Sequence, residues 1–344
     1  MDVIKDKLIL ITGGTGSIGE QLVQTLLEEY SPKRIRIYSR DETKQFNLLK
    51  KFEAYKDKIR LFIGDVRDKD RLIRAMKNVD VVFHLAAMKH VTACEYNPFE
   101  AIKTNIIGLQ NLIEVSIENN VERCIFTSTD KAATPCNTMG VTKLVGEKLV
   151  TTANYYKGNV RTIFYSVRFG NVLGSRGSLI PLIEQQIINN RPIAITHREM
   201  TRYIMGAKTA INLILNTLKI AQGGEVFVLK MHAIKIIDLI EVLVEYFAKK
   251  HNKIKEKIII NEVGMFVGEK LYEELFSIEE SERTYEMKGM YLIFPQLTEV
   301  SRKIDMDKFP NSKKFDGTEP FNSKFGPYLS KKEINELLIK LNII

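Results

Sequence analysis

Short apolar runs rich in β-branched residues alternate with amphipathic stretches through the first half of the chain. The apolar runs predict strands at residues 7–12, 34–38, 59–63, 79–84, 123–128 and 160–168. Between them, apolar side chains recur every three or four residues, which predicts helices at residues 17–29, 42–56, 69–76, 98–119 and 140–156. This alternation indicates a parallel sheet covered by helices.

The regular alternation ends near residue 170, where the glycine-rich stretch FGNVLGSRGSL begins. We therefore predict an α/β protein with a Rossmann-like, doubly wound parallel sheet in residues 1–170. Residues 171–344 are expected to form a smaller C-terminal substrate-binding lobe that interleaves with the first domain. Residues 294–328 have little periodicity and predict a long arm before a last helix at residues 331–341.

Composition narrows the class of protein. A hydrophobic content of 44% with 27% charged residues is typical of a globular protein. No apolar run approaches the roughly 20 residues of a membrane span, and the first residues lack a signal-peptide pattern. We expect a cytoplasmic protein with no membrane partner.

Charge and cysteines exclude two further classes of site. The formal net charge is +9, but the lysines are interspersed with acidic residues and form no block, so we expect no nucleic-acid partner. Cys94, Cys124 and Cys136 form no CxxC pair and no cluster at metal-ligand spacing. We therefore expect reduced thiols and no metal.

A glycine-rich turn directly follows the first predicted strand. Residues 12–19 read TGGTGSIG and place Gly13, Gly16 and Gly19 at the opening of an amphipathic helix. Such a turn lets the backbone approach a pyrophosphate, which the free N–H groups of the helix N-terminus then bind. The turn predicts a dinucleotide site that also includes residues Thr15, Ser17 and Ile18.

The residues after the second strand distinguish NADP from NAD. An acidic residue there would bind the ribose 2′-hydroxyl of NAD, but this chain has Ser39 and Arg40, with Lys44 one turn later. A guanidinium suits the 2′-phosphate of NADP by charge and shape. We expect NADP, and NAD stays the alternative because Asp41 follows immediately.

Residues 127–143 read TSTDKAATPCNTMGVTK, between an apolar strand and a helix. With the GxxGxxG turn, this stretch resembles the extended short-chain dehydrogenase/reductase superfamily, whose members usually carry Tyr-x-x-x-Lys here. Lys143 stands at the lysine position, where it implies a contact with the nicotinamide ribose, but Met139 replaces the tyrosine. The resemblance also implies cofactor contacts by Asp65, Val66, Ala86 and Ala87.

Further motifs resemble the UDP-N-acetylglucosamine 4,6-dehydratases of polysaccharide and flagellin-sugar biosynthesis. These motifs are STDKA, NxMGxxK, HLAAMKHV, NPFEAIKTN, RFGNVLGSRGSLIP, MTRYIM and GEKLYEEL, and they run in family order from about residue 5 to residue 290. The resemblance implies a nucleotide-sugar substrate that is oxidised at C4, loses water across C5 and C6, and regains the hydride at C6.

That chemistry needs an acid and a base side by side, and Asp130 and Lys131 fit these roles. We expect Asp130 to protonate the departing hydroxyl and Lys131 to remove the C5 proton, with a pKa lowered by burial and by cations such as Lys143. Thr129, assisted by Lys143, is the candidate to take up the C4 hydroxyl proton.

The resemblance also implies a set of substrate contacts and a homo-oligomer. The substrate residues are His84, Lys89, Asn171, Arg202 and Glu269, and Arg202 would face the nucleotide diphosphate. The arginine of the family's Arg-Pro-Gly-Glu-Lys motif is replaced by Phe266. Another nucleoside, or anchoring by Lys270 or Lys230, therefore stays open, as does inversion at C5.

Two other functions stay open. A nucleotide-sugar 4-epimerase or 4-ketoreductase would share the fold but need redox chemistry only at C4, so it would not use an Asp130–Lys131 pair. A non-catalytic dinucleotide-binding protein would account for the loss of the tyrosine at Met139. Loss of water from the sugar distinguishes the dehydratase from both.

Overall fold

The computed structural model describes residues 3–317 and 321–344 and is built around one large sheet. Its ten strands lie in the order β15 (Lys313–Lys314), β13 (Thr284–Met287), β14 (Met290–Ile293), β10 (Val226–Leu229), β6 (Ile163–Phe169), β5 (Arg123–Thr129), β4 (Val81–His84), β1 (Leu8–Thr12), β2 (Arg34–Ser39) and β3 (Ile59–Ile63). Neighbouring strands from β10 to β3 are parallel, whereas β14, β13 and β15 form an antiparallel edge. All six predicted strands are confirmed, although β4 and β6 begin slightly later than expected.

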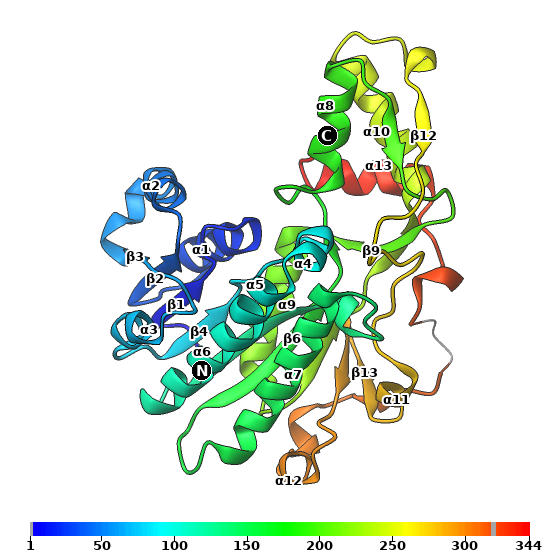
Figure 1. Ribbon diagram of the computed structural model, residues 1–344. Helices are drawn as coiled ribbons and strands as arrows, with labels where there is room; N and C mark the ends of the chain where they lie inside the picture. The colour runs from blue at the N-terminus through cyan, green and yellow to red at the C-terminus, as the bar shows by residue number, and fades with distance from the viewer. Residues whose placement is uncertain (1–2, 318–320) are drawn as a thin grey trace.

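Helices cover both faces of this sheet (Figure 1). One face carries α1 (Ser17–Glu29) and α9 (Ala207–Ile220), and the other carries α3 (Lys69–Met76), α6 (Gly108–Glu118) and α7 (Thr138–Tyr156). Leu22 and Ile214 lie in the core between the sheet and the first set of helices, and Leu112 and Val150 lie in the core between the sheet and the second set. All four side chains are fully buried or nearly so. The predicted α/β fold with a doubly wound parallel sheet is confirmed.

Two predicted helices change their geometry part of the way along. The helix expected at residues 42–56 is α2 (Glu42–Lys51), followed by a 3₁₀ segment. The helix expected at residues 98–119 consists of α5 (Pro98–Ile102), a π-helical turn and α6. The π turn directs Asn105 to the backbone of Met88, whose N–H it accepts at 2.8 Å and whose carbonyl it binds at 3.1 Å. The turn thereby fixes the loop after β4.

A smaller lobe rises beside the carboxyl ends of the central strands (Figure 1). It contains α8 (Leu179–Ile188), α10 (Ile236–Lys250), α13 (Lys331–Lys340), the sheet β11 (His232–Lys235)–β9 (Thr201–Met205)–β7 (Asn171–Val172) and the pair β12 (Ile260–Glu262)–β8 (Ile193–Ile195). Its core is separate and mainly aliphatic. Because β10, β13, β14 and β15 extend the large sheet, residues 171–344 contribute to both parts of the molecule.

The predicted arm at residues 294–328 is mostly irregular but not without structure. It contains α12 (Thr298–Ser301), strand β15 and two short 3₁₀ turns, while its residues 318–320 lie outside the described residues. The predicted last helix is confirmed as α13, which Ser330 and Glu333 begin with a capping box. Among residues 3–317 and 321–344, none of the helices combines the length and the apolar character that crossing a bilayer requires.

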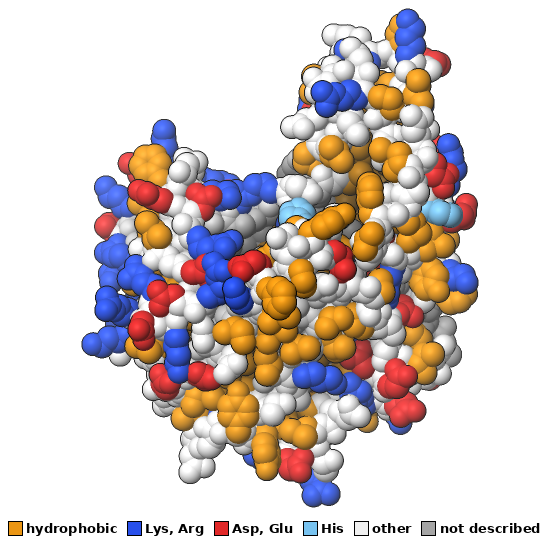
Figure 2. Space-filling view, in the orientation of Figure 1, with side chains coloured by type: hydrophobic (Ala, Val, Ile, Leu, Met, Phe, Trp, Pro, Cys, Tyr) orange, Lys and Arg blue, Asp and Glu red, His pale blue; other side chains and the backbone are white. Residues whose placement is uncertain are grey.

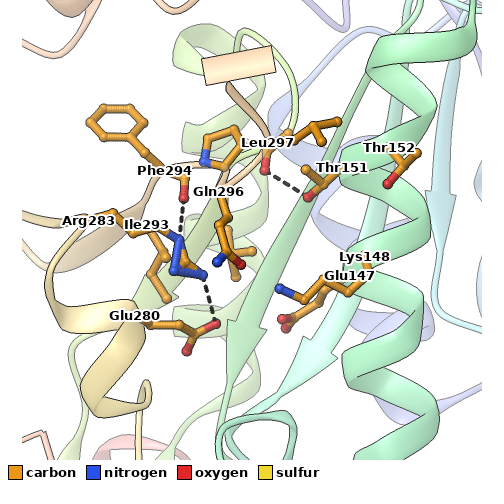
Figure 3. Close-up of a pocket in the computed structure, with 13 residues that line it drawn as sticks. Glu147, Lys148, Thr151, Thr152, Glu280, Arg283, Ile293, Phe294, Gln296 and Leu297 are labelled. Atoms are coloured by element: carbon orange, nitrogen blue, oxygen red, sulfur yellow. Dashed lines mark hydrogen bonds and ion pairs between the residues drawn. The ribbon is translucent and has the colours of Figure 1, made fainter. Parts of the chain in front are cut away.

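A buried charge network ties the catalytic side of the sheet to the antiparallel edge. The Arg168 guanidinium on β6 is fully buried and lies 2.6 Å from Glu147 of α7 and 2.8 Å from Glu280 of α11 (Ile278–Ser281). Figure 3 shows Glu147, Glu280 and Arg283 in the wall of a cavity of about 240 Å³ beside this network. Both carboxylates depend on Arg168, because burial leaves them little water to take its place.

We therefore expect Arg168→Met to lower the free energy of unfolding by about 3–5 kcal/mol, since it leaves Glu147 buried without the guanidinium it contacts and leaves Glu280 with Arg283 at 3.7 Å. Urea unfolding followed by circular dichroism measures the change. Arg161→Met is the matched control: Arg161 pairs with Glu122 at 3.1 Å but its side chain is 54% exposed, so its loss should cost about 0–1 kcal/mol. Equal losses in the two variants would contradict this account.

Candidate active site

The site lies where β1, β4, β5 and β6 reach the same edge of the sheet. The chain order reverses between β1 and β4, so the loops after these strands diverge and leave a crevice at their carboxyl ends. β5 ends at Thr129 and leads into a single 3₁₀ turn, Asp130–Ala132. The most informative motif of the sequence therefore lies at the edge where open α/β sheets bind ligands.

The glycine-rich turn after β1 has no room for a side chain at Gly13 or Gly19. Gly13 has φ +68°, and a Cβ there would lie 2.8 Å from the backbone nitrogen of Ala86; a Cβ on Gly19 would lie 2.5 Å from Cα of Gly14. The first helical N–H groups of α1 receive no side-chain cap from Gly16. These features fit a dinucleotide pyrophosphate, which such a turn binds through backbone N–H groups.

Two more of the predicted cofactor residues, Thr15 and Ser17, contact the loop after β7. The guanidinium of Arg176 donates to the carbonyl oxygen of Thr15, and the backbone nitrogen of Arg176 donates to Ser17 Oγ at 3.0 Å. Lys89, predicted to bind substrate, donates to the carbonyl oxygen of Arg176 at 2.9 Å. One loop thus connects the cofactor turn to the candidate substrate side.

The end of β2 presents a cation where the ribose of a dinucleotide would lie. The Arg40 side chain is 65% exposed, and its Nη1 is 3.7 Å from Asp65 Oδ2. Burial opposes ionisation of Asp65, but hydrogen bonds from Arg67 outweigh it and lower the pKa of that carboxyl. Lys44 lies 2.9 Å from Asp41, so the acidic residue after Arg40 already has a partner.

The other residues predicted near the cofactor have local roles as well. Ser39 Oγ accepts a hydrogen bond from Gln45 at 3.0 Å. Val66 is buried beneath Gly108, where a Cβ would lie 2.6 Å from the valine side chain, so only its backbone can face a ligand. Ala86 borders Gly13, as described above, and Ala87 is partly exposed beside it.

Lys143 extends from α7 beneath the end of β5. Its ammonium donates to the carbonyl oxygen of Thr127 at 2.9 Å and lies 4.6 Å from the centroid of the Phe126 ring. Burial lowers the pKa of Lys143 to about 8, although Glu147 opposes the shift. Met139, one turn earlier on α7, is buried against Cys94, so it fills the usual tyrosine position with an apolar side chain.

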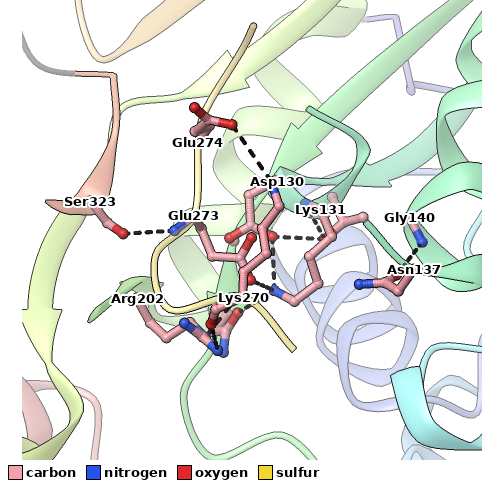
Figure 4. Close-up of polar contacts among 12 residues, drawn as sticks. Asp130, Lys131, Asn137, Gly140, Arg202, Lys270, Glu273, Glu274 and Ser323 are labelled. Atoms are coloured by element: carbon pink, nitrogen blue, oxygen red, sulfur yellow. Dashed lines mark hydrogen bonds and ion pairs between the residues drawn. The ribbon is translucent and has the colours of Figure 1, made fainter. Parts of the chain in front are cut away.

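The Asp130–Lys131 pair forms the polar centre of the site (Figure 4). Lys131 Nζ lies 3.1 Å from Asp130 Oδ1 and 3.1 Å from Asn171 Oδ1. Thr129 donates to the same oxygen of Asp130 at 2.9 Å. Four residues that the sequence predicted for this site therefore lie in one hydrogen-bonded group.

A third acidic residue, Glu273, completes the cluster, and the sequence analysis missed it. Glu273 Oε1 lies 3.1 Å from Lys131 Nζ, and only 1% of the side chain is exposed. Burial raises the pKa of Glu273, and the nearby Asp130 adds to the shift against Lys131 and Arg202. Glu273 lies in the GEKLYEEL motif, but the resemblance to the family motif points to the first acidic residue of that motif, Glu269.

Two expectations about the cluster do not fit the structure. The pKa of Lys131 is raised, not lowered: burial alone would lower it, but the charges of Asp130 and Glu273 outweigh burial. Lys143, the cation expected to lower it, is bound to Thr127 instead. Thr129, which Lys143 was expected to assist, donates to Asp130, while the Lys143 ammonium donates to the carbonyl oxygen of Thr127.

Three of the predicted substrate residues also have other roles here. His84 is fully buried, with Nδ1 2.7 Å from Thr12 Oγ1, and burial lowers its pKa to about 3. Arg202 turns inward: its guanidinium donates to the carbonyl oxygens of Thr201 and Lys270 at 2.8 and 2.9 Å. Glu269 accepts from the backbone nitrogen of Phe266 at 3.0 Å and so closes a local turn.

Of the two lysines considered as replacements for the missing arginine, one borders the site. Lys270 donates to Thr134 Oγ1 at 2.9 Å, immediately beyond the Asp130 turn. Lys230 is paired with Glu286 on β13. Phe266 itself is 55% exposed. A cation is therefore available near the cleft, although not at the position of the family arginine.

Known proteins resemble this chain over most of its length. A protein of Campylobacter jejuni named UDP-N-acetylglucosamine 4,6-dehydratase (inverting) is 45% identical over 300 residues, covering 87% of this chain and 86% of its own. An uncharacterized membrane protein of Methanocaldococcus jannaschii is 49% identical over 99% of this chain and 97% of its own length. A Rickettsia bellii protein named UDP-glucose 4-epimerase is 38% identical over 98% of this chain and 97% of its own length.

A solved structure and a family model agree with these relatives. The X-ray structure of Pen from Bacillus thuringiensis superposes with a TM-score of 0.90 at 43% identity and covers 99% of both chains. The family described as polysaccharide biosynthesis protein matches residues 9–295, which include the glycine turn, the Asp130–Lys131 pair and Glu273. The chain belongs to this polysaccharide biosynthesis family.

Proposed function

We propose that this protein is an NADP-dependent UDP-N-acetylglucosamine 4,6-dehydratase. The observation that carries the proposal is the Asp130–Lys131 pair at the end of β5, beside a turn that fits a dinucleotide pyrophosphate. An acid next to a base is what elimination of water requires. The Campylobacter jejuni relatives with this name, 45% and 44% identical, support the assignment.

The hydrogen bonds support a specific step of the reaction for each side chain. When bound, the dinucleotide supplies the acceptor and later the donor of the hydride that leaves C4 and returns to C6. Thr129 takes up the C4 hydroxyl proton and passes its own proton to Asp130, to which it already donates at 2.9 Å. Asp130 then holds a proton for the C6 hydroxyl as it departs, and Lys131 removes the proton from C5.

Every proton and the hydride are accounted for over these steps. Thr129 gains the C4 hydroxyl proton and gives its own proton to Asp130, and this second proton leaves with the C6 hydroxyl as water, while the C4 hydride ends on C6. The C5 proton taken by Lys131 is replaced when C5 is reprotonated. Asn171, whose amide oxygen accepts from Lys131 at 3.1 Å, keeps the lysine directed towards the sugar side of the cleft.

A nucleotide-sugar 4-epimerase is the second candidate, and the name of the Rickettsia bellii relative favours it. An epimerase removes and returns a hydride at C4 and leaves the C6 hydroxyl in place. Hydride removal and return at C4 does not require two buried carboxylates around one lysine. Mass analysis of the product decides between them, because only dehydration removes the mass of one water.

We expect Asp130→Asn and Lys131→Ala to abolish the loss of water while the bound cofactor is still reduced by substrate. The expected fall in turnover is about 100-fold to 10,000-fold, the usual contribution of a positioned acid or base. Product mass and the absorbance of the reduced nicotinamide are measured on the same sample. Lys148→Ala, on the exposed side of α7, is the control and should keep wild-type turnover; dehydration by both site variants would overturn the assignment.

We propose NADP as the cofactor because the Arg40 side chain is 65% exposed and has only a 3.7 Å ion pair with Asp65, so it can meet a 2′-phosphate, while Asp41 is paired with Lys44. Arg40→Ala should weaken NADP binding by about 10-fold to 100-fold, the equivalent of one hydrogen bond to a charged group, and leave NAD binding unchanged. Fluorescence titration of protein stripped of dinucleotide measures both constants. Lys50→Ala, an exposed lysine on α2, is the control. Tighter binding of NAD than NADP by the wild type would reverse the proposal.

We also propose a homo-oligomer, formed through an exposed apolar face. Hydrophobic side chains gather over α5, α6 and α7 in Figure 2. Exposed large hydrophobic residues on and beside these helices include Tyr96, Phe99, Ile102, Ile107, Val141, Tyr155 and Tyr156. A patch of this kind is typical of a protein interface, and a second copy would cover it.

Phe99→Glu should therefore convert the oligomer to monomer, because it places a charge in an apolar contact. Size-exclusion chromatography with light scattering gives the mass of each species. The control is Phe46→Glu on α2, since Phe46 is comparably exposed, at 65% against 76%, but lies outside this face. A monomeric wild type, or equal behaviour of the two variants, would rule the interface out.

A further inference from the structure

The ammonium of Lys131 is surrounded by three acceptor oxygens in the structure. Its Nζ lies 3.1 Å from Asp130 Oδ1, 3.1 Å from Asn171 Oδ1 and 3.1 Å from Glu273 Oε1. An ammonium has three N–H donors, and here each has one acceptor. The side chain is therefore charged at rest, and it must lose a proton before it can act as a base.

Both carboxylates beside this ammonium have an unused oxygen. Within the described residues, Asp130 Oδ2 and Glu273 Oε2 are buried and have no hydrogen-bond partner. A buried carboxylate kept for a structural ion pair would be expected to have both oxygens satisfied. An unpartnered oxygen can accept a proton, and Asp130 already has one role in the proposed reaction, as the acid towards C6.

We infer that Glu273 takes the proton from Lys131 and so prepares the amine that removes the C5 proton. The N–H bond of the ammonium breaks, an O–H bond forms on Glu273, and the total charge of the pair does not change. Glu273 returns the proton when C5 has been reprotonated. This inference rests on the proposed dehydratase and adds a positioning residue that acts through Lys131.

The surroundings of Glu273 hold it against Lys131 (Figure 4). Its backbone nitrogen donates to Ser323 Oγ at 2.9 Å, and Arg202 Nε lies 3.8 Å from its Oε1. The charged groups that face it are Lys131 and Asp130 from the turn after β5 and Arg202 from β9. Burial favours the protonated form of Glu273, as acceptance of a proton requires.

The test is Glu273→Gln, which keeps the size and the acceptor oxygen but cannot take a proton. At neutral pH we expect kcat for dehydration to fall by about 100-fold, while KM and reduction of the bound cofactor by substrate change little. Glu273→Asp should recover part of kcat, because the carboxylate is restored one methylene further away. Glu279→Gln is the control: Glu279 is an exposed residue of α11, so its loss should leave kcat unchanged.

The pH profile separates proton transfer from a structural role. In the wild type the proton stays inside the cluster, so kcat does not depend on its release to water. In Glu273→Gln the lysine must release it to solvent, so kcat should rise with pH by up to about tenfold per unit until Lys131 is neutral. The substitution also removes one negative charge beside Lys131, so the lysine becomes neutral at a lower pH. The rise of kcat with pH therefore ends earlier, but it is still present. A uniform loss at every pH would overturn the inference.

The outcomes distinguish this inference from the function on which it rests. If the wild type removes no water from the sugar nucleotide, the dehydratase proposal fails. If the wild type dehydrates and Glu273→Gln does so at the wild-type rate, only the role of Glu273 fails. Should the Gln variant not fold, Glu273→Asp decides: measurable dehydration with the wild-type pH profile supports the inference, and activity as low as that of Lys131→Ala contradicts it.

Discussion

A charged lysine held between two buried carboxylates is the interaction on which the candidate site depends. Removal of Lys131 would leave Asp130 and Glu273 buried without the cation between them, whereas removal of either carboxylate would take one of the two anionic partners of the lysine. The arrangement therefore has to be supported from several directions. The 3₁₀ turn after β5 supplies Asp130 and Lys131, the segment after β12 supplies Glu273, and β9 places Arg202 behind Glu273.

The fold explains why these segments meet. Parallel strands bring the ends of β1, β4, β5 and β6 to one edge, and the reversal of strand order opens a crevice there. The chain then crosses between the large sheet and the smaller lobe, so that residues far apart in sequence close the crevice from above. Glu273 and Lys131, separated by 142 positions along the chain, are in contact only because of this crossing.

The local parts of this account could be predicted from the sequence. Short apolar runs located the strands of the first 170 residues, and apolar positions at three- and four-residue spacing located the helices. The glycine turn and the Asp130–Lys131 pair each lie within one short segment. Partners from distant segments could not be predicted. Which carboxylate of GEKLYEEL reaches Lys131, and whether Arg202 points into the cleft or into the protein, depend on the packing of β9 against the segment after β12. Asp130 and Glu273 together raise the pKa of Lys131 against burial, and the part that Glu273 contributes could not be predicted from the sequence.

The most direct test of the account is NMR of the product that the wild-type protein forms from UDP-N-acetylglucosamine in deuterated water. We expect a 4-keto sugar with a methyl group at C6, deuterium at C5 and no solvent deuterium in the methyl group. That pattern requires a base at C5, loss of the C6 hydroxyl and return of the same hydride that left C4. Unchanged substrate, or a sugar altered only at C4 with its C6 hydroxyl intact, would contradict the central claim.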